Sequence, residues 1–457
     1  TGVTDVSHGD LPSSQIEVGD LKILETKLVK TEYTGNEADN QSLFSILPKK
    51  NIESIEFNNT NLTVRKEFIV DITSGSTGTI SAPSGYTFLT FDEERYTLVR
   101  SNNTFEILTS DKFTFIDGST KIKIDNLGSN DTNCRLIATL RKVNITSKTK
   151  LKRPVDSIIV SASNNRSSGT GSTSLNDGLI YGNYPYGTRV QDEEICLNYP
   201  DVNILYGVFE SKDNQNPDSP ITSLVSMTGE TGTTNDLVVG EKFVGRDSQA
   251  IAIYVEKKSD TSIGFIYLSE NSFEQNEIID FQSSNVSANL GSIVVSSNDI
   301  TEKFRLNNGQ SLTHYGYSKI VRDFSTQPPT KKIKIFFMRG YYDPSDSGDV
   351  TTKESYNSFD YQREIPSING VRTTDIIDFR PRVSNYTVSQ GARSPFEFYG
   401  RTFLNGDHSS PHLISGSDSI ILNYSYYLPR YDSIYVDKEG VFSVVSGSPA
   451  DEPKIPE

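Results

Sequence analysis

Hydrophobic and polar residues alternate along much of the chain, as they do in strands that bury one face. Apolar residues of one parity recur in four segments, which contain Leu62, Val64 and Val70, then Leu136, Ala138 and Leu140, then Ile251, Ile253 and Val255, and finally Ile333, Ile335 and Phe337. A long amphipathic helix is not indicated, and a short one is conceivable only at residues 355–361. The pattern therefore predicts an all-β fold.

Turn residues separate the expected strands. Asn307, Asn308 and Gly309 favour a tight turn, because Asn and Gly tolerate positive φ angles. Near the end of the sequence, residues 433–436 and 441–445 flank a four-residue loop and predict a β-hairpin. This spacing indicates several domains, with β-sandwich and small-barrel modules joined by loops rich in Ser, Gly and Asn.

We divide the chain into five parts on the basis of these patterns. They are an N-terminal arm or partial domain at 1–48, a β-sandwich at 49–153, a linker with strands of a further β domain at 154–235, a small β-barrel insertion at 236–290, and a C-terminal β domain at 291–457. Within the insertion, residues 239–243 and 273–279 both place Gly or Asn before Glu and then apolar residues. This similarity indicates either an internal duplication inside one barrel or chance.

Composition narrows the range of functions. The chain has 457 residues and a net charge of -15, which suggests several domains and argues against nucleic-acid binding. No apolar run reaches the roughly 20 residues of a membrane-spanning helix, and no signal peptide is evident. Because the sequence begins at Thr1, we expect a processed product or a segment of a longer chain. Cys134 and Cys196 are expected to be buried and reduced, with a single disulfide as the alternative.

Motifs for catalysis or metal binding are weak. His408 and His412 are separated by a proline, which prevents one continuous helical face. Asp343, Asp346 and Asp349 favour a solvated turn over a calcium site, because their spacing differs from that of an EF-hand loop. No nucleophile–base pair or specific carboxylate pair stands out, and the chain has no Trp to stack on sugars. We therefore expect that the protein is not an enzyme and holds no cofactor or metal.

Several segments of the C-terminal part carry a family resemblance. Residues 376–383 read IIDFRPRV, residues 393–398 read RSPFEF, and residues 426–436 read YYLPRYDSIYV. Residues 300–310, which read ITEKFRLNNGQ, agree with the same pattern. These segments resemble a family of large structural proteins of tailed phages, including T4-like phages of marine cyanobacteria. The resemblance covers about residues 80–457 and is strongest near the end.

The resemblance implies a structural component of a tailed-phage virion that builds the tail baseplate or tail-fibre network through protein–protein contacts. The implied partners are other virion tail and baseplate proteins, and the class of protein suggests a homo-oligomer, with a trimer as the guess. The implied location is the virion tail or baseplate, assembled in the host cytoplasm, with no membrane or nucleic-acid partner. The alternatives are a receptor- or glycan-binding adhesin of the tail, a neck or head-associated structural protein, and an enzyme that degrades the cell envelope.

Two sets of residues are candidates for contacts. The first lies in the resembling segments and is expected to form an interface or to fix domain geometry, with ordinary packing inside the chain as the stronger alternative. It contains Asp378, Phe379, Arg380, Arg382, Tyr427 and Arg430. Asp378 and Arg380 are two apart along an expected strand, so their side chains share a face and can pair. The second set, Tyr181, Tyr184 and Tyr186, holds the best aromatic candidates for a host surface glycan, and loop packing is its alternative.

Overall fold

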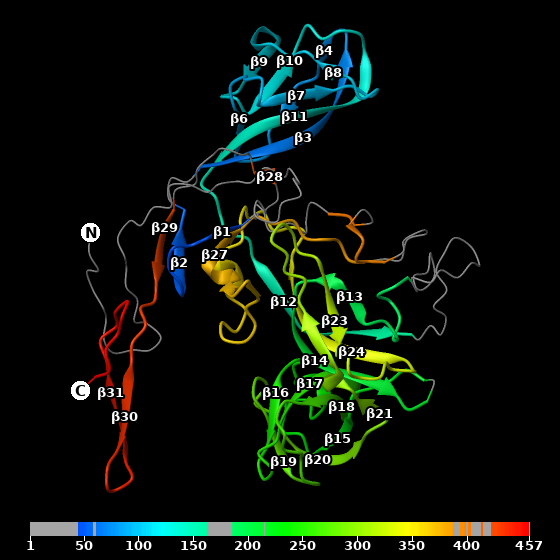
Figure 1. Cartoon of the computed structure of the whole chain (residues 1–457), viewed down its shortest axis with the longest axis vertical. Helices are drawn as coiled ribbons and strands as arrows, with labels where there is room; N and C mark the ends of the chain where they lie inside the picture. The colour runs from blue at the N-terminus through cyan, green and yellow to red at the C-terminus, as the bar shows by residue number, and fades with distance from the viewer. Residues whose placement is uncertain are drawn as a thin grey trace.

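The computed structural model describes residues 44–57, 61–161, 185–213, 215–386, 394–398, 401–403, 413–414 and 422–456. The chain is 47% strand and 5% helical, so the predicted all-β, multidomain fold is confirmed. The helical residues form short 3-10 turns. These are η2 (Ser110–Lys112), η3 (Thr234–Asp236), η4 (Thr301–Lys303), η5 (Lys353–Tyr356) and η6 (Thr373–Asp375). Figure 1 places a sandwich at one end, a barrel at the other, and further sheets between them.

The sandwich pairs a larger sheet with a smaller one. The larger sheet contains, in order, β28 (Leu413–Ile414), β3 (Asn61–Thr73), β11 (Asp131–Val143), β7 (Tyr96–Val99) and β8 (Phe105–Glu106), with β4 (Ser76–Thr77) beside β3 and β6 (Tyr86–Phe88) beside β11. The smaller sheet contains β5 (Ile80–Ser81), β10 (Lys121–Ile124) and β9 (Phe113–Ile116). Alternation in β3 and β11 puts Val64 opposite Leu140, and both side chains are inaccessible.

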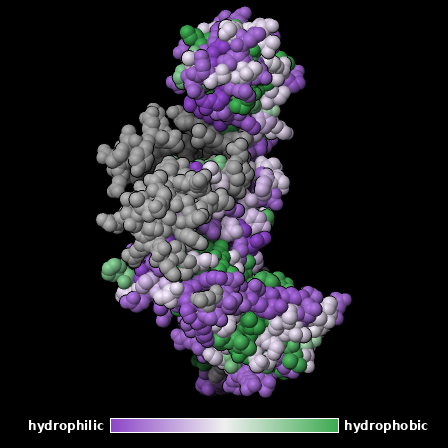
Figure 2. Space-filling view, turned by 90° about the vertical axis from the view of Figure 1, so that its right-hand side faces the viewer, coloured by the Kyte–Doolittle hydropathy of each residue, from purple (hydrophilic) through white to green (hydrophobic). Residues whose placement is uncertain are grey.

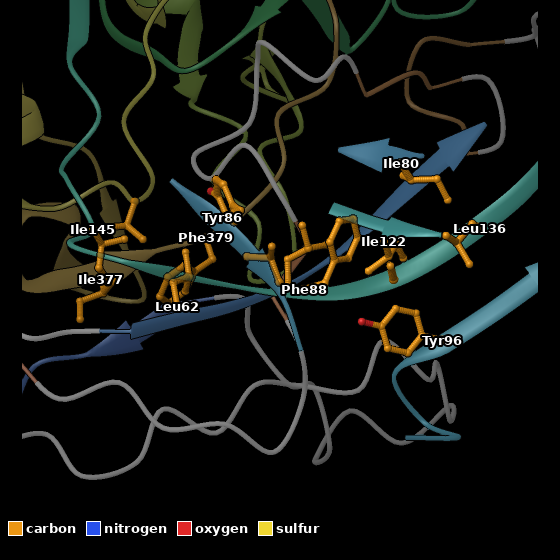
Figure 3. Close-up of a cluster of buried hydrophobic side chains, with 14 of the residues drawn as sticks. Leu62, Ile80, Tyr86, Phe88, Tyr96, Ile122, Leu136, Ile145, Ile377 and Phe379 are labelled. Atoms are coloured by element: carbon orange, nitrogen blue, oxygen red, sulfur yellow. The ribbon is translucent and has the colours of Figure 1, made fainter. Parts of the chain in front are cut away.

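The core of the sandwich continues beyond its own strands. Figure 3 shows Leu62 of β3 close to Ile145, Ile377 and Phe379, and these residues belong to the same buried cluster. Ile145 follows β11, whereas Ile377 and Phe379 belong to the IIDFRPRV segment far along the chain. The IIDFRPRV segment, which is not part of the sandwich sheets, therefore packs against the sandwich core.

Two sheets form the central part of the molecule. One contains, in order, β12 (Lys150–Val160), β24 (Ile333–Tyr342), β14 (Val202–Ser211) and β21 (Ser297–Asp299). The other contains β13 (Glu194–Pro200), β23 (Tyr317–Arg322) and β22 (Phe304–Asn307). The middle strand β24 is buried on both faces, because Phe337 faces the core between these sheets while Phe336 packs on residues of the barrel. This explains the nearly continuous apolar run in its sequence.

The barrel is closed by six antiparallel strands. They are, in order, β15 (Ile221–Val225), β18 (Ser262–Tyr267), β17 (Ile251–Ser259), β16 (Lys242–Gly245), β19 (Ile278–Phe281) and β20 (Ser287–Val294). The barrel thus extends beyond the expected limits of 236 and 290 at both ends, because β15 is needed to close it between β18 and β20. On the face shown in Figure 2, the coloured residues are mostly hydrophilic, and hydrophobic residues form separate patches.

The barrel contains a repeated structural unit. The buried carboxylate of Glu241 accepts backbone N–H groups from Val238, at 2.7 Å, and from Ser283 and Ser284, at 3.0 and 2.9 Å. A second glutamate, Glu277, is held by equivalent loops. Glu277 accepts from the backbone of Glu274, Asp247 and Ser248 at 2.6, 3.1 and 3.1 Å. Each glutamate thus holds its own loop and the loop of the other unit, which favours duplication over chance.

The other expected divisions of the chain also differ from the structure. The limit at residue 153 falls inside β12, whose pairing with β24 starts at Lys150. The expected domain at 291–457 is not one unit, because β22, β23 and β24 complete the central sheets begun by β12, β13 and β14. The boundary at 48 also fails as a division, since residues on both sides of it pair with late strands; residues 1–43 lie outside the described residues. Pairings between strands distant in sequence leave no local trace in composition.

The remaining strands form two-stranded pairs. They are β1 (Phe44–Ile46) with β27 (Ile376–Asp378), β2 (Ile52–Glu56) with β29 (Asn423–Tyr426), β25 (Ser367–Ile368) with β26 (Val371–Arg372), and β30 (Asp432–Val436) with β31 (Phe442–Ser446). The last pair is the predicted C-terminal hairpin, which extends away from the rest of the described chain in Figure 1. Cys134 and Cys196 are both buried and free.

Candidate functional site

The IIDFRPRV segment lies where the sandwich meets the central sheets. In β27, Asp378 pairs with Phe44 of β1 and is also bridged to Thr351. Alternation along this segment sends Ile377 and Phe379 into the sandwich core, while Asp378 and Arg380 share the opposite side. The exposed fraction of both charged side chains is 0%. The segment therefore places a complete ion pair in the interior.

Asp378 and Arg380 form a bidentate pair. Arg380 donates from Nε and Nη2 to the two carboxylate oxygens at 2.9 and 2.8 Å, and its backbone N–H donates to Oδ1 at 2.9 Å. The Tyr315 hydroxyl donates to Oδ2. Burial disfavours the charged form, but attraction to Arg380 outweighs it and lowers the pKa of Asp378. Arg380 also donates from Nη1 to Ser311 O and from Nη2 to Gln310 Oε1, at 2.6 and 2.9 Å.

A second buried pair lies beside the first. Lys150 Nζ is 2.5 Å from Asp201 Oδ2, and both side chains have an exposed fraction of 0%. Lys150 also donates to the Tyr356 hydroxyl at 3.2 Å. Burial lowers the pKa of Lys150 to about 8, in spite of the attraction of Asp201. Arg382 adds a third cation, with Nη2 3.7 Å from Asp201 Oδ2.

We call these residues the charged cluster. Its members are Lys150, Asp201, Tyr315, Tyr342, Tyr356, Asp378, Arg380 and Arg382. The three tyrosine rings surround the lysine, with ring centroids 4.5 Å (Tyr356), 5.3 Å (Tyr315) and 5.7 Å (Tyr342) from Nζ. The positive charge of Arg382 further opposes protonation of Lys150, whereas the charge of Asp378 favours it. The cluster joins β12, β24, β27, η5 and the segment between β13 and β14.

The charged cluster connects strands of different sheets with one another. Its charged side chains are almost inaccessible, and their contacts lie inside the chain. No group of three or more His, Cys, Asp or Glu residues that could hold a metal ion occurs among the described residues. The arrangement can therefore fix geometry and stabilise charge. It offers no open position to an external substrate.

Asp349 forms a further buried anchor that the sequence did not reveal. Its carboxylate accepts from Lys142 Nζ at 2.7 Å, from the Thr146 backbone at 3.0 Å and from the Tyr86 hydroxyl at 3.1 Å. The expected solvated turn is therefore wrong for Asp349, which connects the sandwich with the loop after β24. Asp343 accepts the backbone N–H of its neighbour Ser345 at 2.8 Å, whereas Asp346 accepts those of Gly348, at 2.8 Å, and of the distant Thr149.

The other predicted contact residues lie in two places. Tyr427 donates its backbone N–H to Asn51 O at 2.9 Å, and Arg430 pairs with Asp432 at the base of the hairpin, with Nε 3.1 Å from Oδ1. Tyr186 is half-buried and its ring meets that of Phe396 edge to face.

Tyr181 and Tyr184, the other two glycan candidates, lie outside the described residues. The glycan site predicted from the three tyrosines therefore stays a prediction.

The hairpin carries an exposed apolar face. Register places Ile434 opposite Val444 and Val436 opposite Phe442, and directly opposed residues share a face. These four side chains are exposed by 68%, 59%, 56% and 72%, respectively. Alternating residues in the sequence predicted the strands, but the sequence contains no local indication that both sides of the hairpin are left open.

Comparison of the chain with models of protein families, with curated proteins and with solved structures gives no match. Among the described residues, no helix is both long and apolar enough to cross a membrane.

Proposed function

We propose that the chain is a non-enzymatic structural component of a tailed-phage virion, and that it builds the tail baseplate or tail-fibre network through contacts with other virion proteins. The observation that carries this proposal is the exposed apolar face of the β30–β31 hairpin. The resemblance of the IIDFRPRV and YYLPRYDSIYV segments to phage structural proteins supplies the class of assembly.

A two-stranded hairpin is only marginally stable by itself in water. In this hairpin, four large apolar side chains are more than half exposed on one face. Burying such side chains stabilises a contact by about 1.5–3 kcal/mol each. Binding to a neighbouring chain of the assembly would therefore stabilise both the hairpin and the complex.

The rest of the molecule suits a rigid support for this contact. Arg430 and Asp432 pair at the start of the hairpin, and the preceding strand β29 is fixed to β2 through Tyr424 and Ile55. The expected partners are other tail or baseplate proteins and further copies of this chain, with a trimer as the proposed oligomer.

Among the described residues, Tyr186 does not favour a glycan-binding role, because its ring packs on Phe396 within the chain.

Immunogold labelling of intact virions with an antibody against this chain tests the location. Gold at the tail end supports the proposal, whereas gold on the head or neck contradicts the placement in the tail. Absence of the chain from purified virions by mass spectrometry would contradict the structural role altogether.

Replacing hairpin side chains tests the contact itself. We expect the triple substitution Ile434→Ser, Phe442→Ser and Val444→Ser to prevent incorporation of the chain into virions while the isolated protein stays folded. A matched control replaces three exposed apolar residues outside the hairpin, Phe105, Ile107 and Phe324, which are exposed by 73%, 80% and 91%. Equal incorporation of both variants, measured by mass spectrometry of purified virions, would show that the hairpin is not the contact.

A further inference from the structure

Lys150 and Asp201 meet above a glycine. Lys150 starts β12 on one side of β24, and Asp201 precedes β14 on its other side, so Gly340 of β24 lies between them. The Gly340 backbone N–H donates to Asp201 O at 2.9 Å. A Cβ atom at Gly340 would lie 2.8 Å from Lys150 Cε and 2.9 Å from Asp201 Oδ2. The absence of a side chain at this position is what allows the two groups to touch.

The contact between these groups is not an ordinary ion pair. Charge-assisted N–H···O hydrogen bonds are usually about 2.7–2.9 Å long, whereas Lys150 Nζ lies 2.5 Å from Asp201 Oδ2. In spite of this distance, Oδ2 has no hydrogen-bond partner of acceptable geometry in the part of the chain that is described. The amine is thus pressed against the carboxyl group without the alignment of a hydrogen bond. This approach brings the amine and the carboxyl group close enough to each other for a reaction to be considered.

The surroundings oppose the charged form of Lys150. Neither side chain is reached by water, and three tyrosine rings enclose the amine. In a site of low dielectric, a buried ion pair gains by transferring its proton and becoming a neutral amine and a neutral acid. Burial also lowers the pKa of Lys150, which eases loss of its proton.

Two donors are placed to polarise the carboxyl group. Gln310 Nε2 donates to Asp201 Oδ1 at 3.3 Å. Arg382 Nη2 lies 3.7 Å from Oδ2, and its buried Nε has no hydrogen-bond partner among the described residues. The Gln310 N–H group would stabilise the negative charge that develops on Oδ1 when the carbon is attacked.

We propose that Lys150 and Asp201 condense spontaneously to an intramolecular isopeptide bond. The ammonium first gives a proton to Asp201 Oδ2, which leaves a neutral amine and a carboxylic acid. The nitrogen lone pair then attacks Cγ, and Oδ1 takes the electron pair of the C=O bond. The nitrogen gives up a second proton to Oδ2, the Cγ–Oδ2 bond breaks, and one water leaves as the C=O bond re-forms. Ammonium and carboxylate become amide and water, with no oxidant or other reactant.

The product would be a covalent clasp across the central sheet. It joins the start of β12 to the residue before β14, so that β24 is held between two strands that are tied to each other. Force applied along the chain at this place would then load a covalent bond in addition to the hydrogen bonds of the sheet. This inference concerns the chemistry of one site and does not depend on the location of the protein in a virion.

Intact-mass spectrometry of the folded full chain, after denaturation, tests the proposal. We expect a mass lower than that of the sequence by one water, and a digest in which the peptide of Lys150 is joined to the peptide of Asp201. Folded protein with the full sequence mass would overturn the proposal. Loss of water without a joined peptide would overturn it as well, because a cyclised aspartate loses the same mass.

Three variants sharpen this test. Lys150→Met is expected to keep the full mass of its sequence. Asp201→Asn is expected to lose ammonia in place of water, and so to reach the same final mass as the reacted wild type. The matched control is Lys142→Met, which removes the lysine that donates to both oxygens of Asp349 at 2.7 Å with regular geometry. That variant should still lose one water, and failure to do so would overturn the assignment to Lys150.

Discussion

The barrel and the charged cluster bury carboxylates in two different ways. In the barrel, Glu241 and Glu277 are surrounded by backbone N–H groups and hydroxyl groups, which are neutral donors. In the charged cluster, Asp378 faces Arg380, and both charges are removed from water together. Loss of a carboxylate therefore leaves only unpaired dipoles in the barrel but an unpaired charge in the cluster. We therefore expect the free energy of unfolding to depend more on a single carboxylate in the charged cluster than on one in the barrel.

The two regions also differ in how many parts of the molecule their buried carboxylates connect. Each barrel glutamate connects loops of one module, and the repeated unit gives Gln249 and Asn285 the same left-handed conformation, with φ of 54° and 55°. The cluster instead connects elements from β12 to β27, which belong to different sheets. Damage to the barrel should thus stay local, whereas damage to the cluster should loosen the arrangement of sheets.

The largest effect is expected for Asp378→Asn, which keeps the shape of the side chain but leaves Arg380 buried without its counter-charge. Breaking a buried pair in this way costs about 3–5 kcal/mol. The matched control is Asp280→Asn in the exposed pair of Asp280 with Arg246, whose two hydrogen bonds are 2.7 and 2.8 Å long. That change should cost at most about 1 kcal/mol. Urea unfolding of both variants measures the difference, and equal losses would contradict the distinction between the two sites.

A smaller effect is expected for Glu277→Gln and Glu241→Gln. Each variant keeps one acceptor oxygen but turns the other into a donor that faces N–H groups, at a cost of about 1–3 kcal/mol. Because the two sites are equivalent in the repeated unit, the losses should be similar to each other. A calorimetric scan that shows a loss for one variant only would count against a duplicated role.

Alkaline pH should distinguish the regions by their tyrosines. Burial raises the pKa of Tyr315, Tyr342 and Tyr356 in the cluster above the usual value, and raises the pKa of Tyr254 in the barrel to about 12. The unfolded chain then releases these protons at lower pH than the folded chain, so stability is fully present below pH 10 and falls above it. At one pH unit above the unfolded pKa, each such tyrosine contributes a loss of about 1.4 kcal/mol.

The variants Tyr342→Phe and Tyr254→Phe separate these contributions. In the wild type, the free energy of unfolding should fall between pH 9 and pH 11. In each variant this fall should be smaller by the contribution of the one tyrosine that is replaced. Urea unfolding across this range measures the slope. An unchanged slope in both variants would mean that other groups set the alkaline limit.

The smallest effect on folding is expected at the hairpin. Phe442→Ser removes a side chain that is 72% exposed, so the free energy of unfolding of the isolated chain should change by at most about 0.5 kcal/mol. A loss above about 2 kcal/mol in thermal or urea unfolding would show that the side chain is covered in the isolated protein. The same comparison thus ranks the cluster, the barrel and the hairpin.

The features that the sequence predicted are those carried by neighbouring residues. Alternation revealed the strands, the residues around Glu241 and Glu277 indicated either a duplication or chance, and the turn at residues 437–440 indicated the hairpin. Pairing of Asp378 with Arg380 was also foreseeable, because residues two apart on a strand share a face.

The remaining features depend on contacts between distant residues. Lys150 lies in the sequence beside the cations Lys148, Lys152 and Arg153, and only folding places it against Asp201. In the sequence, Asp349 does not differ from many other acidic loop residues, and only the folded structure shows its ion pair with Lys142. Patterning shows that a residue belongs to a strand, but not which other strand will cover it. Interpretation of the IIDFRPRV segment as an interface or a geometric element could not be decided without these contacts.

Hydrogen exchange followed by mass spectrometry tests most directly the claim that the charged cluster holds the sheets together. In Asp378→Asn, we expect faster exchange of backbone amides in β1, β27 and the adjacent end of β24, with unchanged exchange in the barrel strands β16 and β19. Unchanged exchange around β27, or an equal loss of protection in the barrel, would contradict the claim.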